Sequence, residues 1–291
     1  MESTGFIGLG VMGEPMCRNL ARKGGCPVLA YDLSPGALER LAPDSVRAAG
    51  STVEVMEDAS VVFLSLPSGV EVKAVCEGPH GLIAHARPGQ CIVDLGTSPV
   101  ALAHSLAAQL AAKGAMFADA PVARTREAAI AGTLSIMVGA DDPTFARIAP
   151  LLSTMASEIT HCGGVGAGQL VKILNNMVLA QTVVALSEAL AAARRSGVDG
   201  KLLFETLAKG SADSFALRNH GMKAMLPGAF PERAFSTEYM LKDLQYALDL
   251  AREAGLEMRG ASNAHALLSE ALATGQGKAY WPVVSRVIDR A

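Results

Sequence analysis

The sequence lacks a strong excess of either charge. Its 291 residues include 25 Lys and Arg against 28 Asp and Glu, which gives a formal net charge of −3, and the two signs are interspersed along the chain. Proteins that bind nucleic acid or an anionic membrane surface through their charge usually carry a basic patch or stripe. We therefore expect neither a nucleic-acid partner nor a membrane partner.

Cysteine is sparse as well. The five cysteines, at positions 17, 26, 76, 91 and 162, are odd in number and widely separated. Cysteine-ligated metal sites and disulfide-stabilised folds need closely spaced or paired cysteines. The spacing therefore predicts neither a metal site nor a disulfide framework.

A long uninterrupted apolar run is also missing. The most apolar helical stretch, near residues 177–193, contains Gln181, Ser187 and Glu188, whereas a membrane-spanning helix needs about 20 predominantly apolar residues. We expect a core helix there. The N-terminus leads directly into the first predicted strand, so we also expect no secretory signal peptide and a cytoplasmic location.

What the sequence does contain is a glycine-rich turn near its N-terminus. Residues 5–13, Gly-Phe-Ile-Gly-Leu-Gly-Val-Met-Gly, combine a short apolar strand with a turn that opens a helix. In dinucleotide-binding folds the first glycine permits a tight turn, the second lets the backbone approach the pyrophosphate, and the third lets the helix pack closely on the strand. The helix start also presents free N–H groups to the phosphates. The predicted cofactor contacts are Gly8, Leu9, Gly10, Val11, Met12 and Gly13.

A second predicted strand, at residues 28–31, strengthens this interpretation. It ends in Asp32, 19 residues after Gly13, which is the length of one strand–helix–strand unit. A carboxylate at this position accepts hydrogen bonds from the ribose hydroxyls and repels a 2′-phosphate, and no Arg or Lys follows in residues 33–35 to neutralise one. We therefore predict NAD in preference to NADP. The alternative is that Asp32 only forms a turn.

Short apolar runs alternate with helical stretches in the first part of the chain. They lie at residues 61–66, 91–94, 116–119, 134–138 and 159–162. This alternation predicts an α/β fold, a Rossmann-type, doubly wound and mostly parallel sheet covered by helices on both faces. After residue 163 the strand pattern ends. We predict an NAD-binding Rossmann domain over residues 1–163 and an all-helical domain, for substrate binding and oligomerisation, over residues 164–291.

The predicted helical domain begins with a long helix from about residue 167 to 195. Lys172, Asn175 and Asn176 interrupt its apolar series, and spacings of three and four residues place them on one face. Asparagine is a poor helix former, so two in succession inside a helix need an explanation. A solvated polar stripe is one explanation. A substrate site at the junction of two domains is the other. Further helices are predicted near residues 199–208, 214–225, 236–254, 261–273 and 281–289.

Several motifs, in one order, together resemble a known family. They are residues 5–13, Leu66-Pro67, Asp94 to Thr97, Asp119-Ala120-Pro121-Val122, Gly132-Thr133-Leu134, Gly168-Gln169, Lys172 to Asn176, and Lys242-Asp243-Leu244. The sequence is similar over nearly its whole length to the β-hydroxyacid dehydrogenases, which include 3-hydroxyisobutyrate dehydrogenase and tartronate semialdehyde reductase.

The resemblance implies an NAD-dependent oxidoreductase that transfers hydride between a small 3-hydroxy acid and its semialdehyde. It implies that Lys172 is the general acid/base and that Asn175 and Asn176 help bind substrate. Lysine suits this role, since burial and a second nearby cation lower the pKa of an amine that must take up or deliver a hydroxyl proton. The resemblance also implies a homodimer or homotetramer. The implied cofactor contacts beyond the glycine turn are Leu66, Pro67, Thr97 and Lys242, the last of which is implied to lie beside the nicotinamide or the substrate. An exposed helix lysine is the commoner role for Lys242.

The sequence departs from the family where Asp-Ala-Pro-Val usually continues with Ser-Gly-Gly. It has Ala123, Arg124 and Thr125 instead, so a hydroxyl is lost and a guanidinium is gained. Arginine suits a carboxylate, sulfonate or phosphate, so we expect a small anionic hydroxy acid or aldehyde bound in part by these residues. The Arg-Thr pair resembles sulfolactaldehyde reductases, although Leu179 replaces a serine that these enzymes carry. A solvated Arg124 is the alternative.

A second departure is the turn from Asp94 to Pro99, which is one residue shorter than is usual in the family. Ser98 there is a weaker candidate for a contact to the nicotinamide or the substrate, and its ordinary role would be the N-cap of a helix that Pro99 begins. Three alternative functions stay open at this stage: a sulfolactaldehyde reductase, a tartronate semialdehyde reductase, and a non-catalytic dinucleotide-binding module. Imine reductases also resemble this family, but they replace the catalytic lysine that this chain keeps as Lys172.

Overall fold

A computed structural model describes residues 3–232 and 234–290. The chain divides into two compact units, Met1–Lys172 and Ile173–Ala291. The division falls inside helix α8 (Ala167–Arg195), so the first turn and a half of this helix belong to the N-terminal unit. The sequence places a domain boundary between residues 163 and 164, before this helix, and that boundary stays a prediction.

The described part of the N-terminal unit is built on a nine-stranded sheet. Its order is β3-β2-β1-β4-β5-β6-β8-β7, and β9 pairs with β8. Strands β1 to β6 are parallel, while β8 runs antiparallel to β6 and β7. The strands are β1 (Thr4–Ile7), β2 (Val28–Tyr31), β3 (Val46–Ala48), β4 (Val61–Leu64), β5 (Cys91–Asp94), β6 (Met116–Asp119), β7 (Val122–Ala123), β8 (Leu134–Gly139) and β9 (Ala156–Gly163). The predicted mostly parallel sheet is confirmed.

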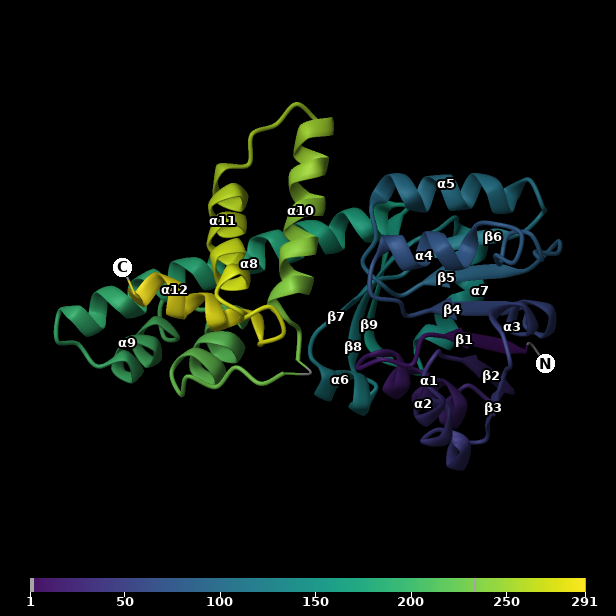
Figure 1. Cartoon of the computed structure of the whole chain (residues 1–291), viewed down its shortest axis with the longest axis horizontal. Helices are drawn as coiled ribbons and strands as arrows, with labels where there is room; N and C mark the ends of the chain where they lie inside the picture. Colours follow the sequence, from purple (N-terminus) through teal and green to yellow (C-terminus); the bar gives the residue numbers. More distant parts are fainter. Residues whose placement is uncertain (1–2, 233, 291) are drawn as a thin grey trace. The chain divides into compact units, whose positions relative to one another are not determined.

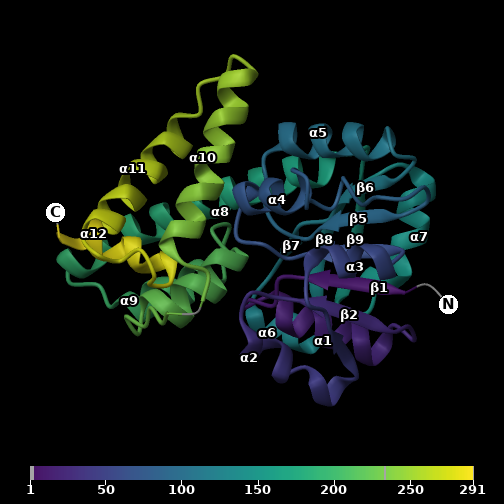
Figure 2. The same ribbon diagram turned by 45° about the vertical axis from the view of Figure 1, so that its right-hand side comes forward.

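Helices cover both faces of this sheet, because successive strand residues point to opposite sides. In β4, Val61 and Phe63 enter one apolar cluster, while Val62 and Leu64 enter the other. The first cluster includes residues of α1 and α7, and the second includes residues of α3, α4 and α5 (Figures 1 and 2). The helices are α1 (Gly13–Lys23), α2 (Pro35–Glu39), α3 (Thr52–Asp58), α4 (Gly69–Cys76), α5 (Val100–Ala111), α6 (Arg126–Ala131) and α7 (Asp142–Leu152), with a 3-10 turn η1 (Ala42–Asp44).

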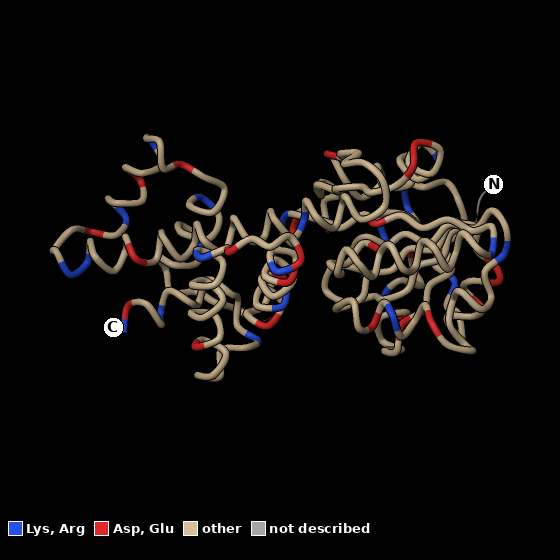
Figure 3. Tube along the Cα trace, turned by 90° about the horizontal axis from the view of Figure 1, so that it is seen from above, with Lys and Arg blue, Asp and Glu red and all other residues tan. Residues whose placement is uncertain are grey.

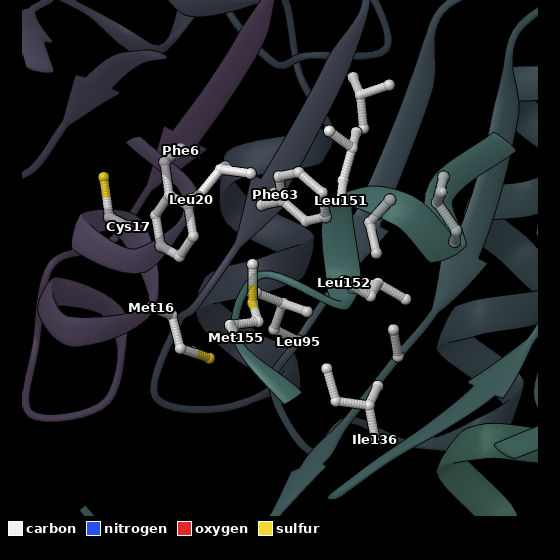
Figure 4. Packing of buried hydrophobic residues seen from close by; sticks show 14 of the residues in the cluster. Phe6, Met16, Cys17, Leu20, Phe63, Leu95, Ile136, Leu151, Leu152 and Met155 are labelled. Carbon is white, nitrogen blue, oxygen red and sulfur yellow. The ribbon is translucent and has the colours of Figure 1, made fainter. Parts of the chain in front are cut away.

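Aromatic and sulfur-containing side chains fill the first cluster, as Figure 4 shows. Phe6 of β1 and Phe63 of β4 lie with ring centroids 6.1 Å apart. Leu20 of α1 and Leu152 of α7 are fully buried in the same cluster. Burying a side chain of this size stabilises the fold by roughly 1.5–3 kcal/mol, so this layer holds the strands and helices around β1 in place.

The strand order reverses its direction between β1 and β4. From β1 the chain first extends the sheet through β2 and β3, and it then returns to place β4 on the other side of β1. In doubly wound sheets, ligands bind beyond the carboxyl ends of the strands at such a reversal. The glycine turn at residues 8–13 follows β1 at that position.

The described part of the C-terminal unit is helical, as predicted. Helices α10 and α11 lie side by side (Figures 1 and 2), and a single isolated bridge pairs Ser236 with Tyr280. The predicted helix at 214–225 is a π-helix over a shorter range, and the last predicted helix is split after a Pro-containing 3-10 turn. The elements after α8 are α9 (Gly200–Leu207), the π-helix η2 (Leu217–Met225), α10 (Thr237–Glu253), α11 (Arg259–Ala273), η3 (Trp281–Val284) and α12 (Ser285–Arg290).

Helix α8 is long and apolar enough to cross a membrane by length and composition alone. However, 44% of its most apolar window is already buried within the protein, and core helices of globular proteins pass the same test. Charged residues of both signs are interspersed along the trace of each unit (Figure 3). Both observations fit the expectation of a core helix in a chain of mixed charge.

Candidate functional site

The glycine turn after β1 has the geometry that a dinucleotide pyrophosphate needs. Gly8 has a φ of +93°, and a Cβ there would lie 2.3 Å from the carbonyl oxygen of Ser65. A Cβ on Gly13 would lie 2.0 Å from the carbonyl oxygen of Gly8, so only glycine lets α1 begin this close to the strand. A Cβ on Gly10 would meet no atom within 4 Å. Two glycines therefore serve the turn and its packing, and the third leaves an open approach to the backbone.

Asp32, directly after β2, reaches back to this turn. Its Oδ2 accepts a hydrogen bond from the N–H of Leu9 at 2.6 Å, and its Oδ1 accepts one from the N–H of Ser34 at 2.7 Å. An ionised carboxylate has about four acceptor positions, so both oxygens can accept further hydrogen bonds. Asp32 is therefore a part of the turn as well as a candidate partner for ribose hydroxyls.

The two loops that follow β4 and β5 approach the same turn. A Cβ on Gly8 would lie 3.1 Å from Cδ2 of Leu66, and a Cβ on Gly96 would lie 3.1 Å from the carbonyl oxygen of Leu66. Pro67, which comes next, is exposed, and Thr97, which follows Gly96, is partly exposed. The structure thus brings together the glycine turn and the loops that carry three further predicted cofactor contacts.

A buried carboxylate holds the start of α8. Asp119, at the end of β6, accepts hydrogen bonds from the N–H of Gly166 at 2.6 Å and from the N–H of Gln169 at 2.7 Å. Burial raises the pKa of Asp119, although the backbone N–H donors oppose this shift. Lys172 follows one helical turn after Gln169, and 8% of it is exposed. The predicted catalytic lysine is therefore buried on a helix whose first turn is fixed to the end of a strand.

A second buried carboxylate, Asp94 at the end of β5, organises the next loop. It accepts hydrogen bonds from the N–H of Gly96 at 2.9 Å and from the hydroxyl of Ser98 at 2.7 Å. The side-chain amide of Gln169 also contacts this loop: it donates to the carbonyl of Gly96 at 2.9 Å and to Asp94 at 3.3 Å, and it accepts from the N–H of Ser98 at 3.0 Å. The first turn of α8 and the loop around Thr97 thus share one hydrogen-bond network.

The prediction for Ser98 as a helix N-cap is wrong. Helix α5 begins at Val100, its N-cap residue is Pro99, and no side chain caps it. The hydroxyl of Ser98 instead donates to Asp94. A hydrogen bond to a buried carboxylate is stronger than one to an exposed helix end, which explains the outcome.

The unusual loop after β7 has a conformation that an arginine rarely adopts. Arg124 has a φ of +86°, in the left-handed region that favours glycine. Its Nη1 donates to the carbonyl of Thr133 at 2.5 Å and to the hydroxyl of Ser157 at 2.9 Å, and the residue as a whole is exposed. Ala123 and Thr125 beside it are partly buried. One nitrogen of the guanidinium is thus fixed to the N-terminal unit itself.

The C-terminal unit holds a second polar cluster, on α8 and α10. The amide of Asn176 donates to Oδ2 of the buried Asp243 at 2.6 Å, and the exposed Asn175 donates to Oδ1 of Asn176 at 3.1 Å. Lys242 pairs with Oδ1 of Asp243 at 2.9 Å, and its Nζ lies 4.9 Å from the centre of the Tyr246 ring. Asp243 therefore binds Asn176 and Lys242 directly, and Asn175 joins this cluster through Asn176.

Asp94, Asp119, Gln169 and Asp243 have no predicted role of their own, although all four lie in motifs that carry the family resemblance. A signal for the first two is present in the sequence. Each acidic residue directly ends an apolar strand, and the carboxyl ends of neighbouring parallel strands share one edge of a sheet. A signal for Asp243 is its place among Met240, Leu244 and Ala247 on the buried face of α10.

The comparisons with known proteins agree with this geometry over the whole chain. Residues 3–164 match the model for the NAD binding domain of 6-phosphogluconate dehydrogenase. Residues 166–283 match the model described as the NAD-binding domain of NADP-dependent 3-hydroxyisobutyrate dehydrogenase. The chain belongs to the β-hydroxyacid dehydrogenase family. It is accordingly an oxidoreductase with an NAD(P)-binding domain, which confirms the family resemblance and the predicted enzyme class.

Two relatives illustrate the range of the family. The chain is 33% identical to the 2-(hydroxymethyl)glutarate dehydrogenase of Eubacterium barkeri over 283 residues, which are 97% of this chain and 93% of the relative. It is 37% identical to the 3-hydroxyisobutyrate dehydrogenase of Pseudomonas aeruginosa over 256 residues, which are 85% of each chain. Similarity to dehydrogenases over such lengths favours a catalytic protein over a non-catalytic binding module.

Solved structures give the same assignment. The 3-hydroxyisobutyrate dehydrogenase of Mycobacterium tuberculosis, solved with L-serine, matches with a TM-score of 0.90 and 32% identity, and the match covers 100% of both chains. An imine reductase from Myxococcus stipitatus matches with a TM-score of 0.67 but only 16% identity, over 99% of both chains. The second match shows a shared fold alone.

Proposed function

We propose that this chain is an NAD-dependent dehydrogenase of small anionic 3-hydroxy acids or, in the opposite direction, a reductase of the matching semialdehydes. The names of the relatives, 3-hydroxyisobutyrate and 2-(hydroxymethyl)glutarate dehydrogenase, support this substrate class. The observation that carries the proposal is the burial of Lys172 on α8. It lies one helical turn after Gln169, which is hydrogen-bonded to Asp94 and Asp119 at the ends of the neighbouring strands β5 and β6. A reactive lysine is unlike an ordinary helix lysine, which stays exposed.

The choice of NAD over NADP rests on Asp32. The carboxylate lies directly beside the glycine turn and keeps acceptor capacity for ribose hydroxyls, whereas a 2′-phosphate would meet its negative charge. The arginines nearest in sequence already pair with acids: Arg22 with Asp44 at 2.6 Å and Arg40 with Glu14 at 2.9 Å. NADP appears in the description of the family model for residues 166–283, so a direct comparison of the two cofactors is needed.

In this proposal Lys172 moves the proton and the cofactor moves the hydride. When bound, a nicotinamide dinucleotide supplies the acceptor or donor of a hydride on the reacting carbon. During oxidation the Nζ of Lys172 accepts the proton from the substrate hydroxyl as the C–O bond becomes a carbonyl. During reduction the same nitrogen returns a proton to the carbonyl oxygen. The glycine turn, Leu66, Pro67 and Thr97 would hold the cofactor.

Three polar side chains are proposed to bind the substrate's anionic end or its hydroxyl. Arg124 offers N–H donors beyond the nitrogen fixed to Thr133, and Asn175 is exposed. Lys242 adds a positive charge held in place by Asp243, while the buried Asn176 orients its neighbour Asn175. The guanidinium at position 124 also keeps a sulfonate or a tartronate-type substrate as a second candidate.

A substrate panel tests the proposal. Purified protein would be mixed with 3-hydroxyisobutyrate, 2-(hydroxymethyl)glutarate, glycerate, tartronate semialdehyde and sulfolactaldehyde, each with NAD(H) and NADP(H), and absorbance of the reduced cofactor would be followed. We expect turnover of at least one 3-hydroxy acid or semialdehyde, with a higher kcat/KM for NAD(H). Turnover with NADP(H) alone would contradict the cofactor assignment, and no turnover of any of these compounds would contradict the substrate class.

We also propose a homodimer or homotetramer in the cytoplasm. Three apolar side chains of α8, Leu170, Val171 and Val178, are 39%, 41% and 57% exposed, which is typical of a surface that a second subunit covers. The described cysteines form no disulfide bonds, which fits a reducing compartment. Light scattering coupled to size-exclusion chromatography gives the mass of the assembly, and a monomer at micromolar concentration would contradict the oligomer.

A further inference from the structure

Gln169 is a buried glutamine whose side-chain amide is hydrogen-bonded through both its nitrogen and its oxygen. It is 0% exposed. Its amide nitrogen donates to the carbonyl of Gly96 and to Asp94, its amide oxygen accepts from the N–H of Ser98, and its backbone N–H donates to Asp119. A buried amide with all its polar atoms bonded to fixed partners has one orientation only.

This orientation matters because Gln169 lies close in sequence to Lys172, and the loop that its amide contacts contains Thr97. Gln169 and Lys172 are three residues apart on α8 and share one face of the helix. Gly96 and Ser98, which the amide contacts, flank Thr97 on both sides. The side chain of Gln169 therefore connects the helix turn before the proposed proton carrier to the loop of a proposed cofactor contact.

The start of α8 has no capping residue of its own to fix its position. The helix follows Gly166, and Ala167 and Gly168 lie in its first turn. None of these three residues has a side chain that can accept a hydrogen bond from the free N–H groups. A Cβ on Gly168 would lie 2.4 Å from the carbonyl oxygen of Met137, so the first turn is packed directly on β8. The N–H groups are satisfied by Asp119 instead. Side chains of the sheet thus set the position of this helix.

We propose that Gln169 is a positioning residue: its side-chain amide locks the first turn of α8 to the Gly96–Ser98 loop, so that Lys172 and Thr97 are held at a fixed separation. This inference rests on the proposed role of Lys172. Asp94 and Asp119 fix the two partners that the amide joins. Without the amide, the fold keeps its strands and helices, but the amine of Lys172 no longer meets the reacting atoms at the distance that proton transfer needs.

Gln169→Leu removes the amide at nearly constant volume, and Gln169→Glu places an oxygen against the acceptors Gly96 and Asp94. We expect kcat on a turned-over substrate of the panel to fall on the order of tenfold to a hundredfold in both variants, with the NADH dissociation constant within about twofold of wild type. The matched control is Gln109→Leu, the same change on α5 at a partly buried glutamine that bonds Glu77 and Ser105. This control should leave kcat unchanged.

A double-mutant comparison shows whether Gln169 acts through the lysine. In the Lys172→Ala background, Gln169→Leu should reduce the remaining single-turnover rate by no more than about twofold, because the group it positions is already missing. If Gln169→Leu lowers the rate by the same factor in the Lys172→Ala background as in wild type, the inference is overturned. If Lys172→Ala itself retains wild-type turnover, the proposed function fails first, and the two failures are thereby distinguished.

A second readout needs neither substrate nor cofactor. Amide hydrogen exchange in the protein alone should show faster exchange at Ser98 in Gln169→Leu, because its N–H loses the amide oxygen that accepts from it. Should Gln169→Leu fail to fold, Ser98→Ala removes only the hydroxyl bond to Asp94, and a several-fold drop in kcat with unchanged NADH binding is expected. Faster exchange at Ser98 in Gln169→Leu combined with wild-type kcat in that variant would refute a positioning role, and wild-type kcat in Ser98→Ala would count against it equally.

Discussion

The two units hold their polar residues in different ways. In the N-terminal unit, carboxylates at strand ends bind backbone N–H groups: Asp32 binds Leu9, and Asp119 binds Gly166 and Gln169. In the C-terminal unit, side chains bind other side chains, as Asn176 of α8 and Lys242 of α10 do with Asp243. A backbone partner cannot be changed by substitution, whereas a side-chain partner can. The bond from the N–H of Leu9 to Asp32 therefore does not depend on the side chain at position 9, whereas a substitution of Asn176 removes its bond to Asp243.

The largest expected effect concerns Lys172. Replacing it with alanine should lower kcat by roughly 10²–10⁴-fold, the usual contribution of general acid–base catalysis. The glycine turn is untouched, so NADH binding, measured by fluorescence, should stay within about twofold of wild type. Lys172→Arg is the matched control for charge, because arginine stays protonated and cannot serve as the base. Undiminished turnover in Lys172→Ala would remove this residue from the mechanism.

A pair of glycine substitutions separates folding from cofactor binding within the N-terminal unit. Gly13→Ala places a Cβ 2.0 Å from the carbonyl oxygen of Gly8, and Gly10→Ala places one where no atom lies within 4 Å. We expect Gly13→Ala to destabilise the protein by about 3 kcal/mol or more. Gly10→Ala should unfold like wild type but bind NADH about tenfold more weakly. Thermal unfolding and fluorescence titration measure the two effects, and equal stability of both variants would contradict the packing role of Gly13.

The next effect tests cofactor choice. Asp32→Ala removes the negative charge that disfavours a 2′-phosphate and the acceptor for the N–H of Leu9. We expect kcat/KM with NAD to fall about tenfold while that with NADP stays level or rises, because one charged hydrogen bond is worth roughly 1.5–3 kcal/mol. Asp32→Asn serves as a control that keeps the shape. A wild-type enzyme that prefers NADP would show that the second strand was misinterpreted.

The smallest expected effect is a pH dependence in the C-terminal unit. His220 lies in the π-helix, is 5% exposed, and its Nδ1 lies 2.5 Å from the hydroxyl oxygen of Tyr280. Burial lowers its pKa to about 4 from the ordinary value of 6.5. Below pH 6.5 the unfolded chain therefore takes up a proton that the folded chain refuses, so stability is present above 6.5 and is lost as pH falls toward 4.

Linkage gives the size of this loss. Between about pH 7.5 and about pH 5 the histidine should cost roughly 2 kcal/mol of unfolding free energy. Denaturant unfolding at both values would measure it, and His220→Gln should flatten this part of the profile. The exposed His80 provides the control His80→Gln, for which no flattening is expected. An identical acid loss in His220→Gln and wild type would assign the effect to other groups.

Much of the fold was predictable from periodicity. The alternation of short apolar runs with helical stretches identified the parallel strands and the all-helical region after residue 163. The two-residue strand β7 and the three-residue strand β3 carry too few residues for a pattern. The π-helix at Leu217–Met225 has wider turns than an α-helix and i→i+5 hydrogen bonds, and composition does not encode this difference.

The candidate site was predictable where glycines or motif residues mark it. The glycine turn, Asp32 and the polar face of α8 all follow from spacing. The contacts between Ser98 and Gln169 and between Asn176 and Asp243 could not be predicted, because each joins residues far apart in the sequence. Local preference favoured a helix cap for Ser98, and the buried carboxylate of Asp94 outweighs it. The left-handed backbone of Arg124 likewise has no local signal.

Chemical rescue of Lys172→Ala is the most direct test of the central claim that an amine at this position transfers the proton. Small primary amines such as methylamine and ethylamine would be added to the variant, and turnover of a substrate identified by the panel would be followed through NADH absorbance. The account predicts a rate that rises with the concentration of the free amine in Lys172→Ala and does not change in wild type. Turnover in the variant that equals wild type without any added amine would contradict it.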